Sequence, residues 1–161
     1  MNLLITGTTS GIGLKLAQDY LAAGDTVYCC GRNKLVLNEL VAAFGNRAIP
    51  VSFDVKNRED CLAALAALPE LDLVILNAGT CEYIDASNFD AASFERVISI
   101  NLIGFANCLE ALIPKLVAGS SLALMGSSSS YLPLPRAEAY GASKAAIEYL
   151  AKTLAITLGK K

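Results

Sequence analysis

The 161-residue sequence contains no histidine and no tryptophan. Without histidine the chain has no Ser-His-Asp triad, no Cys-His pair and no histidine-bound metal. Acid–base chemistry must therefore come from tyrosine, lysine, aspartate or glutamate. We expect no metal site.

The five cysteines form no C-x-x-C pair. The adjacent Cys29 and Cys30 would point to opposite faces of a strand. We interpret the cysteines as small buried hydrophobic residues in the reducing environment of the cytoplasm.

Charge is scarce as well, because only 17% of the residues are charged and the net charge is −2. This balance offers no basic surface for nucleic acid. The uncharged stretch 97–109 is interrupted by polar residues and is shorter than the roughly 18 apolar residues that a spanning helix needs. The first apolar run follows no basic region, so it is typical of a strand and not of a signal peptide. We expect neither nucleic acid nor a membrane among the partners.

Apolar residues make up 54% of the chain, which is enough for one compact domain over residues 1–161. Strand and helix patterns alternate along the whole sequence. We expect strands at residues 3–5, 26–30, 48–53, 71–76 and 121–125, and helices at 14–21, 33–44, 58–68, 91–117 (with a bend at Gly104) and 140–158.

Nearly unbroken apolar strands between helices indicate an α/β protein whose parallel sheet is covered on both faces. Right-handed crossovers make this a doubly wound, Rossmann-like fold. If a nucleotide binds at the switch point between strands one and four, the expected strand order is 3-2-1-4-5.

The stretch Thr6-Gly7-Thr8-Thr9-Ser10-Gly11-Ile12-Gly13 joins the first strand to the first helix. Gly7 can supply a sharp turn, Gly11 lets the backbone approach a bulky anion, and Gly13 lets the helix pack on the strand. The helix N-terminus that follows suits a pyrophosphate. The alternative is a plain tight turn between a strand and a helix.

Tyr140 and Lys144 lie four residues apart, so a helix would bring the phenol and the ammonium to one face. A nearby cation favours the phenolate and lowers a tyrosine pKa from its ordinary value of about 10. The alternative is an ordinary surface pair.

Over essentially its whole length the chain resembles the short-chain dehydrogenase/reductase family. The resemblance rests on residues 6–13 as the cofactor turn, Asn77-Ala78-Gly79 after strand four, Asn101 in a helix, Tyr140-x-x-x-Lys144, and Ser127 thirteen residues before Tyr140. One departure is Leu76, where the family usually has a second asparagine.

The resemblance implies hydride transfer between a nicotinamide and a carbonyl or alcohol. Ser127 would hydrogen-bond the substrate oxygen, and Tyr140 would give or take its proton. Lys144 would hold the nicotinamide ribose. Asn101 would anchor a water that relays protons to Lys144. Alternatively, Asn101 caps a helix kink and Ser127 is a turn residue, with Ser128 able to substitute for it.

Two further positions have alternatives of their own. Asp54 and Val55 match the family's adenine contact, but the acid could instead belong to a helix N-terminus. Asn77 and Gly79 either admit the cofactor ribose or tie strand four to its neighbour.

At the end of strand two, NAD-binding chains normally carry an acid that binds the ribose 2′-hydroxyl. Here that position is Gly31, and Arg32 follows it. Because a guanidinium can pair with a 2′-phosphate, we expect NADP(H), with NAD(H) possible. The alternative is a solvated Arg32. The predicted cofactor-binding residues are Gly7, Thr9, Ser10, Gly11, Ile12, Gly13, Arg32, Asp54, Val55, Asn77, Ala78, Gly79, Tyr140 and Lys144.

Family members usually continue past the Tyr/Lys helix into further strands and a substrate loop, which this sequence lacks. A different class of function is therefore open, a regulatory or scaffold module that binds nucleotide without turnover. The apolar segment 131–135 hints at a small carbonyl compound with an apolar body as the substrate. The alternative is that this segment packs against the substrate loop. Apolar helices at 91–117 and 140–158 favour a homodimer or homotetramer.

Overall fold

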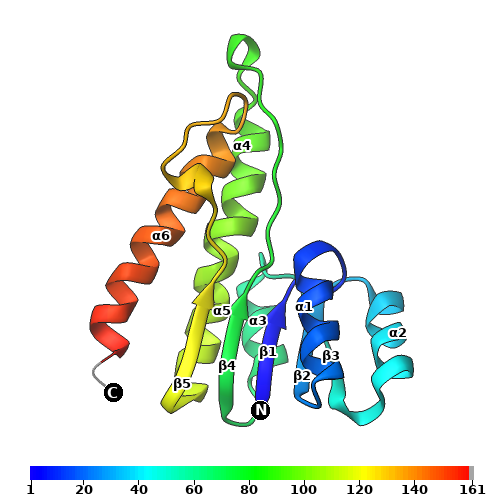
Figure 1. The fold of residues 1–161 in the computed structure, drawn as a ribbon. Coiled ribbons are helices and arrows are strands. Elements are labelled where there is room, and N and C mark those ends of the chain that lie inside the picture. The colour runs from blue at the N-terminus through cyan, green and yellow to red at the C-terminus, as the bar shows by residue number, and fades with distance from the viewer. Residues whose placement is uncertain (160–161) are drawn as a thin grey trace.

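A computed structural model describes residues 1–159. Its core is a sheet of parallel strands in the order β3-β2-β1-β4-β5, as predicted (Figure 1). The strands are β1 (Asn2–Thr6), β2 (Thr26–Gly31), β3 (Ala48–Ser52), β4 (Leu71–Leu76) and β5 (Leu116–Leu124).

Helices cover both faces of this sheet, and the connections have the doubly wound arrangement. Helices α1 and α2 pack on one face, and α3, α5 and α6 contribute to the core on the other (Figure 1). The helices are α1 (Gly11–Ala22), α2 (Lys34–Phe44), α3 (Arg58–Leu65), α4 (Ala91–Ile98), α5 (Gly104–Leu112) and α6 (Glu138–Leu158).

The two-residue period of the strands divides the core into two clusters. Leu3 and Ile5 of β1 belong to the cluster under α1 and α2, whereas Leu4 belongs to the cluster under α3 and α5. Cys29 and Cys30 divide in the same way, as predicted, and burial raises the pKa of the Cys29 thiol to about 12. Four of the five cysteines are buried; Cys81 is exposed, which the sequence did not predict.

Local sequence signals determine where helix α2 begins and ends. Asn33 accepts hydrogen bonds from the backbone N–H groups of Leu35 and Val36 and so caps the helix. At the other end Gly45 adopts a φ of 64°, a value that glycine tolerates better than other residues. Both ends agree with the prediction.

Two predicted helix ends were wrong. Helix α3 ends at Leu65, not at residue 68, and the Lys115 ammonium donates to the Ala66 carbonyl just beyond it. The helical run after α4 ends at Lys115, and β5 begins at Leu116 instead of residue 121, because residues from 116 onward pair with β4 across an irregular register.

One continuous helical run, Ala91–Lys115, is long and apolar enough to cross a membrane by length and composition alone. It comprises α4, a π-helical segment at Ser99–Ile103, α5 and a short 3-10 turn. Phe105 and Leu112 pack into the main core, and Val97 packs into a small cluster with Ile84 and Ala139. Inside the domain, 44% of its most apolar stretch is buried, so burial accounts for part of its apolar character.

Strands β1 and β4 are tied together where they end. The side chain of Thr6 is 1% exposed, and its hydroxyl accepts hydrogen bonds from the backbone N–H groups of Asn77 (2.9 Å) and Ala78 (3.0 Å). The Asn77 amide donates in return to the Thr6 carbonyl (3.1 Å). Asn77 thus links strand four to its neighbour, which was one of its two predicted roles, and also fixes the point where the two chains diverge.

This link predicts a cost for Thr6→Val, which keeps the shape of the side chain but leaves two N–H groups without an acceptor. We expect the free energy of unfolding, measured by urea titration, to fall by about 2 kcal/mol. The matched control is Thr157→Val on the exposed side of α6, which should change stability by less than about 0.5 kcal/mol. Equal effects of the two substitutions would contradict the role given to Thr6.

Candidate active site

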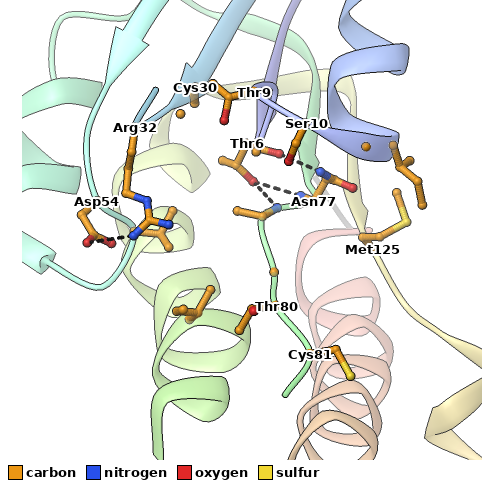
Figure 2. A pocket seen from close by; sticks show the side chains of 18 of the residues that line it. Thr6, Thr9, Ser10, Cys30, Arg32, Asp54, Asn77, Thr80, Cys81 and Met125 are labelled. Atoms are coloured by element: carbon orange, nitrogen blue, oxygen red, sulfur yellow. Dashed lines mark hydrogen bonds and ion pairs between the residues drawn. The ribbon is translucent and has the colours of Figure 1, made fainter. Parts of the chain in front are cut away.

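A cavity of about 480 Å³ opens at the carboxyl ends of the strands, where β1 and β4 diverge (Figure 2). Every predicted cofactor-binding residue except Gly13 lines it. This is the position at which doubly wound sheets bind their ligands. The lining also includes residues that the sequence did not single out, among them Cys30, Phe53, Thr80, Cys81, Ile100 and Met125.

The glycine-rich turn forms one wall of the cavity. Gly7 has a φ of 77°, and its backbone N–H donates to the Cys30 carbonyl at 2.9 Å. A Cβ atom on Gly13 would lie 2.2 Å from the Gly7 carbonyl oxygen, so Gly13 lies beneath the turn and does not line the cavity. Its predicted role in close packing agrees with this position, and its assignment as a cavity residue does not.

The start of α1 carries the features of an anion site. Ser10 occupies the N-cap position, but its side chain makes no capping hydrogen bond. A Cβ atom on Gly11 would meet nothing within 4 Å, so the space above the helix N-terminus is open. Backbone N–H groups and the positive end of the helix dipole therefore face that space, which suits a pyrophosphate.

The β2–β3 end of the cavity carries an acid between two cations. The Arg32 guanidinium lies 3.8 Å from the Asp54 carboxylate (Figure 2). The Lys56 ammonium lies 3.9 Å from the same oxygen. The Arg32 side chain is 70% exposed, so these pairs are weak and exchangeable. Asp54 lies outside α3, whose N-cap is Asn57, so it is not an acid of that helix.

The turn that carries Asp54 and Val55 rests on α5. The Asn107 amide donates to the Val55 carbonyl at 2.9 Å, and a Cβ atom on Gly104 would lie 2.8 Å from the Val55 side chain. Asn107 is buried, and the sequence analysis did not assign it a role. The signal that could have found it is a polar residue on the buried face of an otherwise apolar helix.

Tyr140 and Lys144 lie at the opposite end of the cavity, on α6. The Lys144 ammonium is 5.6 Å from the centre of the Tyr140 ring and donates to the Met125 carbonyl at 2.7 Å. Lys144 is 3% exposed, and burial lowers the pKa of its ammonium below the ordinary value. The pair therefore shares one face of the helix, as predicted. The contact with the main chain at Met125 left no signal in the sequence.

Asn101 lies in the π-helical segment and is fully buried. Its side-chain amide donates to the Thr80 carbonyl (2.9 Å) and to the Ser143 hydroxyl (3.0 Å), and its oxygen accepts from the Thr80 N–H (2.8 Å). These bonds join the loop after β4 to α6. π-Helical turns of this kind often occur at functional sites.

Ser127 is the one predicted catalytic residue outside both the cavity lining and the buried network. It caps the 3-10 turn Ser128–Ser130, and its hydroxyl accepts from the Ser129 N–H at 3.2 Å. This is the turn geometry that had been the alternative to a catalytic role. Ser128 is exposed and does not line the cavity either.

Comparisons with known proteins agree with this architecture. The family model for short chain dehydrogenases matches residues 1–161. The chain is 31% identical to a 3-beta-hydroxysteroid dehydrogenase of Comamonas testosteroni, over 98% of this chain and 64% of that protein. It is 30% identical to a probable NADP-dependent dehydrogenase of Haemophilus influenzae, over 88% of this chain and 59% of that protein.

Among solved structures, the closed form of a serine dehydrogenase complexed with NADP+ superposes with a TM-score of 0.93. That chain is 27% identical, and the match covers 98% of this chain and 66% of the other. The chain thus spans about three fifths of the two relatives' lengths, 64% and 59%. A match over all of this sequence, together with the shared strand order, shows that the chain belongs to the short-chain dehydrogenase family.

Proposed function

We propose that the protein is an oxidoreductase that transfers hydride between NADP(H) and a carbonyl or alcohol substrate. The observation that carries this proposal is one cavity with an anion-binding helix N-terminus at its centre and the Tyr140–Lys144 pair at one end. The nicotinamide supplies the hydride chemistry when bound. All other roles belong to side chains of this chain.

Tyr140 would move the proton of the substrate oxygen. Tyr140 lines the cavity, and the Lys144 ammonium, 5.6 Å from the centre of its ring, is the cation that would favour the negative charge formed when the phenol gives up its proton. The bond to the Met125 carbonyl keeps that ammonium in position. Lys144 would also donate to the nicotinamide ribose.

Ser127 and Asn101 would complete the site. We propose that the Ser127 hydroxyl, which donates to the Ser129 hydroxyl at 3.3 Å, donates instead to the substrate oxygen, where it would stabilise developing charge. Asn101 would hold the loop after β4 and α6 in register through its three hydrogen bonds, and so keep a proton-relay water near Lys144. The role of Ser127 requires its hydroxyl to turn toward the cavity, whereas the role of Asn101 needs no change in its hydrogen bonds.

The adenine half of the site would favour NADP(H). Arg32 is exposed and weakly paired, so its guanidinium can turn from Asp54 to a 2′-phosphate. Asp54 and Val55 would contact the adenine. The relative named as NADP-dependent and the neighbour complexed with NADP+ support this preference.

The substrate would carry an apolar body next to its carbonyl or hydroxyl group. Tyr131, Leu132 and Leu134 follow the Ser127 turn and are largely exposed, so they offer an apolar surface before α6. Exposed Ile103 and Ile156 on the helices that flank the main core support a homodimer or homotetramer.

A second hollow, about 600 Å³, lies between β5 and α6 and is lined mainly by apolar residues such as Leu122, Leu124, Leu154 and Leu158. Within residues 1–159, β5 pairs only with β4. We propose that a further strand and a substrate loop cover this hollow in the active enzyme. On their own, residues 1–161 would then act as a nucleotide-binding module without efficient turnover, which is the alternative function.

The first prediction concerns the proton donor. Tyr140→Phe keeps the ring and removes the transferable proton, so in a form of the protein as long as its relatives turnover should fall by a factor of roughly 10² to 10⁴. Nucleotide binding, measured by titration calorimetry, should change little. Tyr149→Phe on the exposed side of the same helix is the matched control. Full turnover by Tyr140→Phe would assign the role elsewhere.

The second prediction concerns the cofactor. Calorimetric titration should give tighter binding of NADP+ than of NAD+, and Arg32→Ala should weaken NADP+ roughly tenfold while leaving NAD+ nearly unchanged. Lys34→Ala, which removes a nearby exposed cation outside the cavity, should have little effect. Equal affinity of the wild type for both nucleotides would contradict the preference.

The third prediction concerns chain length. Residues 1–161 should bind NADP(H) weakly and reduce carbonyl compounds poorly, because a nicotinamide misplaced by about 1 Å can cost roughly a hundredfold in rate. A form extended to the length of the relatives should recover turnover. The measurement is steady-state reduction by both forms at saturating NADPH, and equal rates would show that no further segment is needed.

A further inference from the structure

Gly31, the last residue of β2, lies directly against Thr9 of the glycine-rich turn. A Cβ atom built on Gly31 would be 2.5 Å from the Thr9 methyl group and 3.3 Å from its hydroxyl oxygen. The first distance is far below van der Waals contact, so the space in which a side chain at position 31 would begin is already filled. Both residues line the candidate active-site cavity, and Arg32 follows Gly31 directly in the sequence. Figure 2 shows Thr9 and Arg32 in this cavity.

The surrounding hydrogen bonds keep Thr9 in this position. The backbone N–H groups of Gly7 and Thr8 both donate to the Cys30 carbonyl, at 2.9 and 3.0 Å, and the Thr8 hydroxyl donates to it as well. The turn is therefore fastened to the end of β2 immediately before the contact, at the Cys30 carbonyl. A β-branched side chain such as threonine is also restricted at χ1, so its methyl group moves aside only at a cost.

Position 31 is where an NAD-binding chain of this architecture carries the acid that holds the ribose 2′-hydroxyl. We propose that Thr9 is a specificity-determining residue, because its methyl group occupies the space that this acid would need. This inference rests on the proposed nucleotide-dependent function and deepens its cofactor preference. Thr9 excludes the NAD arrangement sterically, and Arg32 supplies the attraction for a 2′-phosphate.

It follows that an acid at position 31 increases the affinity for NAD+ only when the side chain of residue 9 is shortened. In Gly31→Asp alone, Thr9 forces the carboxylate aside. The affinity for NADP+ then falls because the carboxylate repels the 2′-phosphate, while the affinity for NAD+ rises little. In Thr9→Ala/Gly31→Asp the nearest remaining atom is the Cβ of residue 9, at 3.5 Å from the new Cβ, which is an ordinary contact. The carboxylate can then point at the ribose.

The test is a double-mutant cycle on NAD+ affinity, with the wild type, Thr9→Ala, Gly31→Asp and the double variant titrated by calorimetry. We expect the double variant to bind NAD+ about tenfold more tightly than the product of the two single effects predicts. A coupling factor below about threefold would overturn the proposal.

A second pair of variants tests the contact without any ligand and without a new charge. Gly31→Ala adds only the Cβ atom, so it should lower the melting temperature, and Thr9→Ala/Gly31→Ala should restore most of the loss. Gly126→Ala is the control, since a Cβ atom there would meet nothing within 4 Å. If Gly31→Ala and Gly126→Ala shift the melting temperature equally, the steric argument is wrong.

The outcomes separate this proposal from the cofactor preference itself. The preference is measured on the wild type and its Arg32→Ala variant, whereas the coupling is measured between positions 9 and 31. A wild type without preference, combined with strong coupling, would remove Arg32 as the phosphate ligand but keep the steric conflict between Thr9 and an acid at position 31. A clear preference for NADP+ without coupling would keep Arg32 as the phosphate ligand and remove Thr9 as a steric determinant.

Discussion

The hydrogen bonds of the Thr6 hydroxyl to the chain after β4 are the constraint on which the site depends. They hold β1 and β4 together up to the last residue, and the chains then separate in opposite directions. The cavity exists because two neighbouring strands send their loops apart at this point. The glycine-rich turn, the Asp54 turn and the Tyr140 helix all take their places around that opening.

Elements whose signals are local could be predicted from the sequence. The Asn33 cap and the Gly45 stop define α2 through contacts within a few residues, and uninterrupted apolar strands between helices predicted the parallel sheet. The strand order followed from expecting a nucleotide site at the switch point between strands one and four. The start of β5 could not be predicted, because it depends on pairing of Leu116 with Leu71, far away in the sequence. A short apolar segment fits the end of a helix and the start of a strand equally well.

The same distinction between local signals and distant contacts applies to the candidate site. Motif spacing predicted that the glycine-rich turn and the Tyr140–Lys144 pair line one cavity, since each motif lies within one short segment. Spacing could not identify contacts made through space, such as Asn107 beneath Val55 or Thr9 against Gly31. Spacing also could not show that the Ser127 hydroxyl bonds with Ser129 and that Ser127 lies outside the cavity lining.

The π-helical segment around Asn101 changes the direction in which the residues after it point from the helix axis. Buried positions along this run recur every four residues, at 93, 97, 101 and 105, whereas an α-helix completes a turn in 3.6. In an unbroken α-helix such a stripe would wind steadily around the axis. The wider π turn takes up this excess rotation, so a single rod presents Val97 to the small cluster near Ile84 and Phe105 to the sheet. One helical run therefore supports two sides of the cavity, because Asn101 holds the loop after β4 and Asn107 holds the turn of Asp54 and Val55.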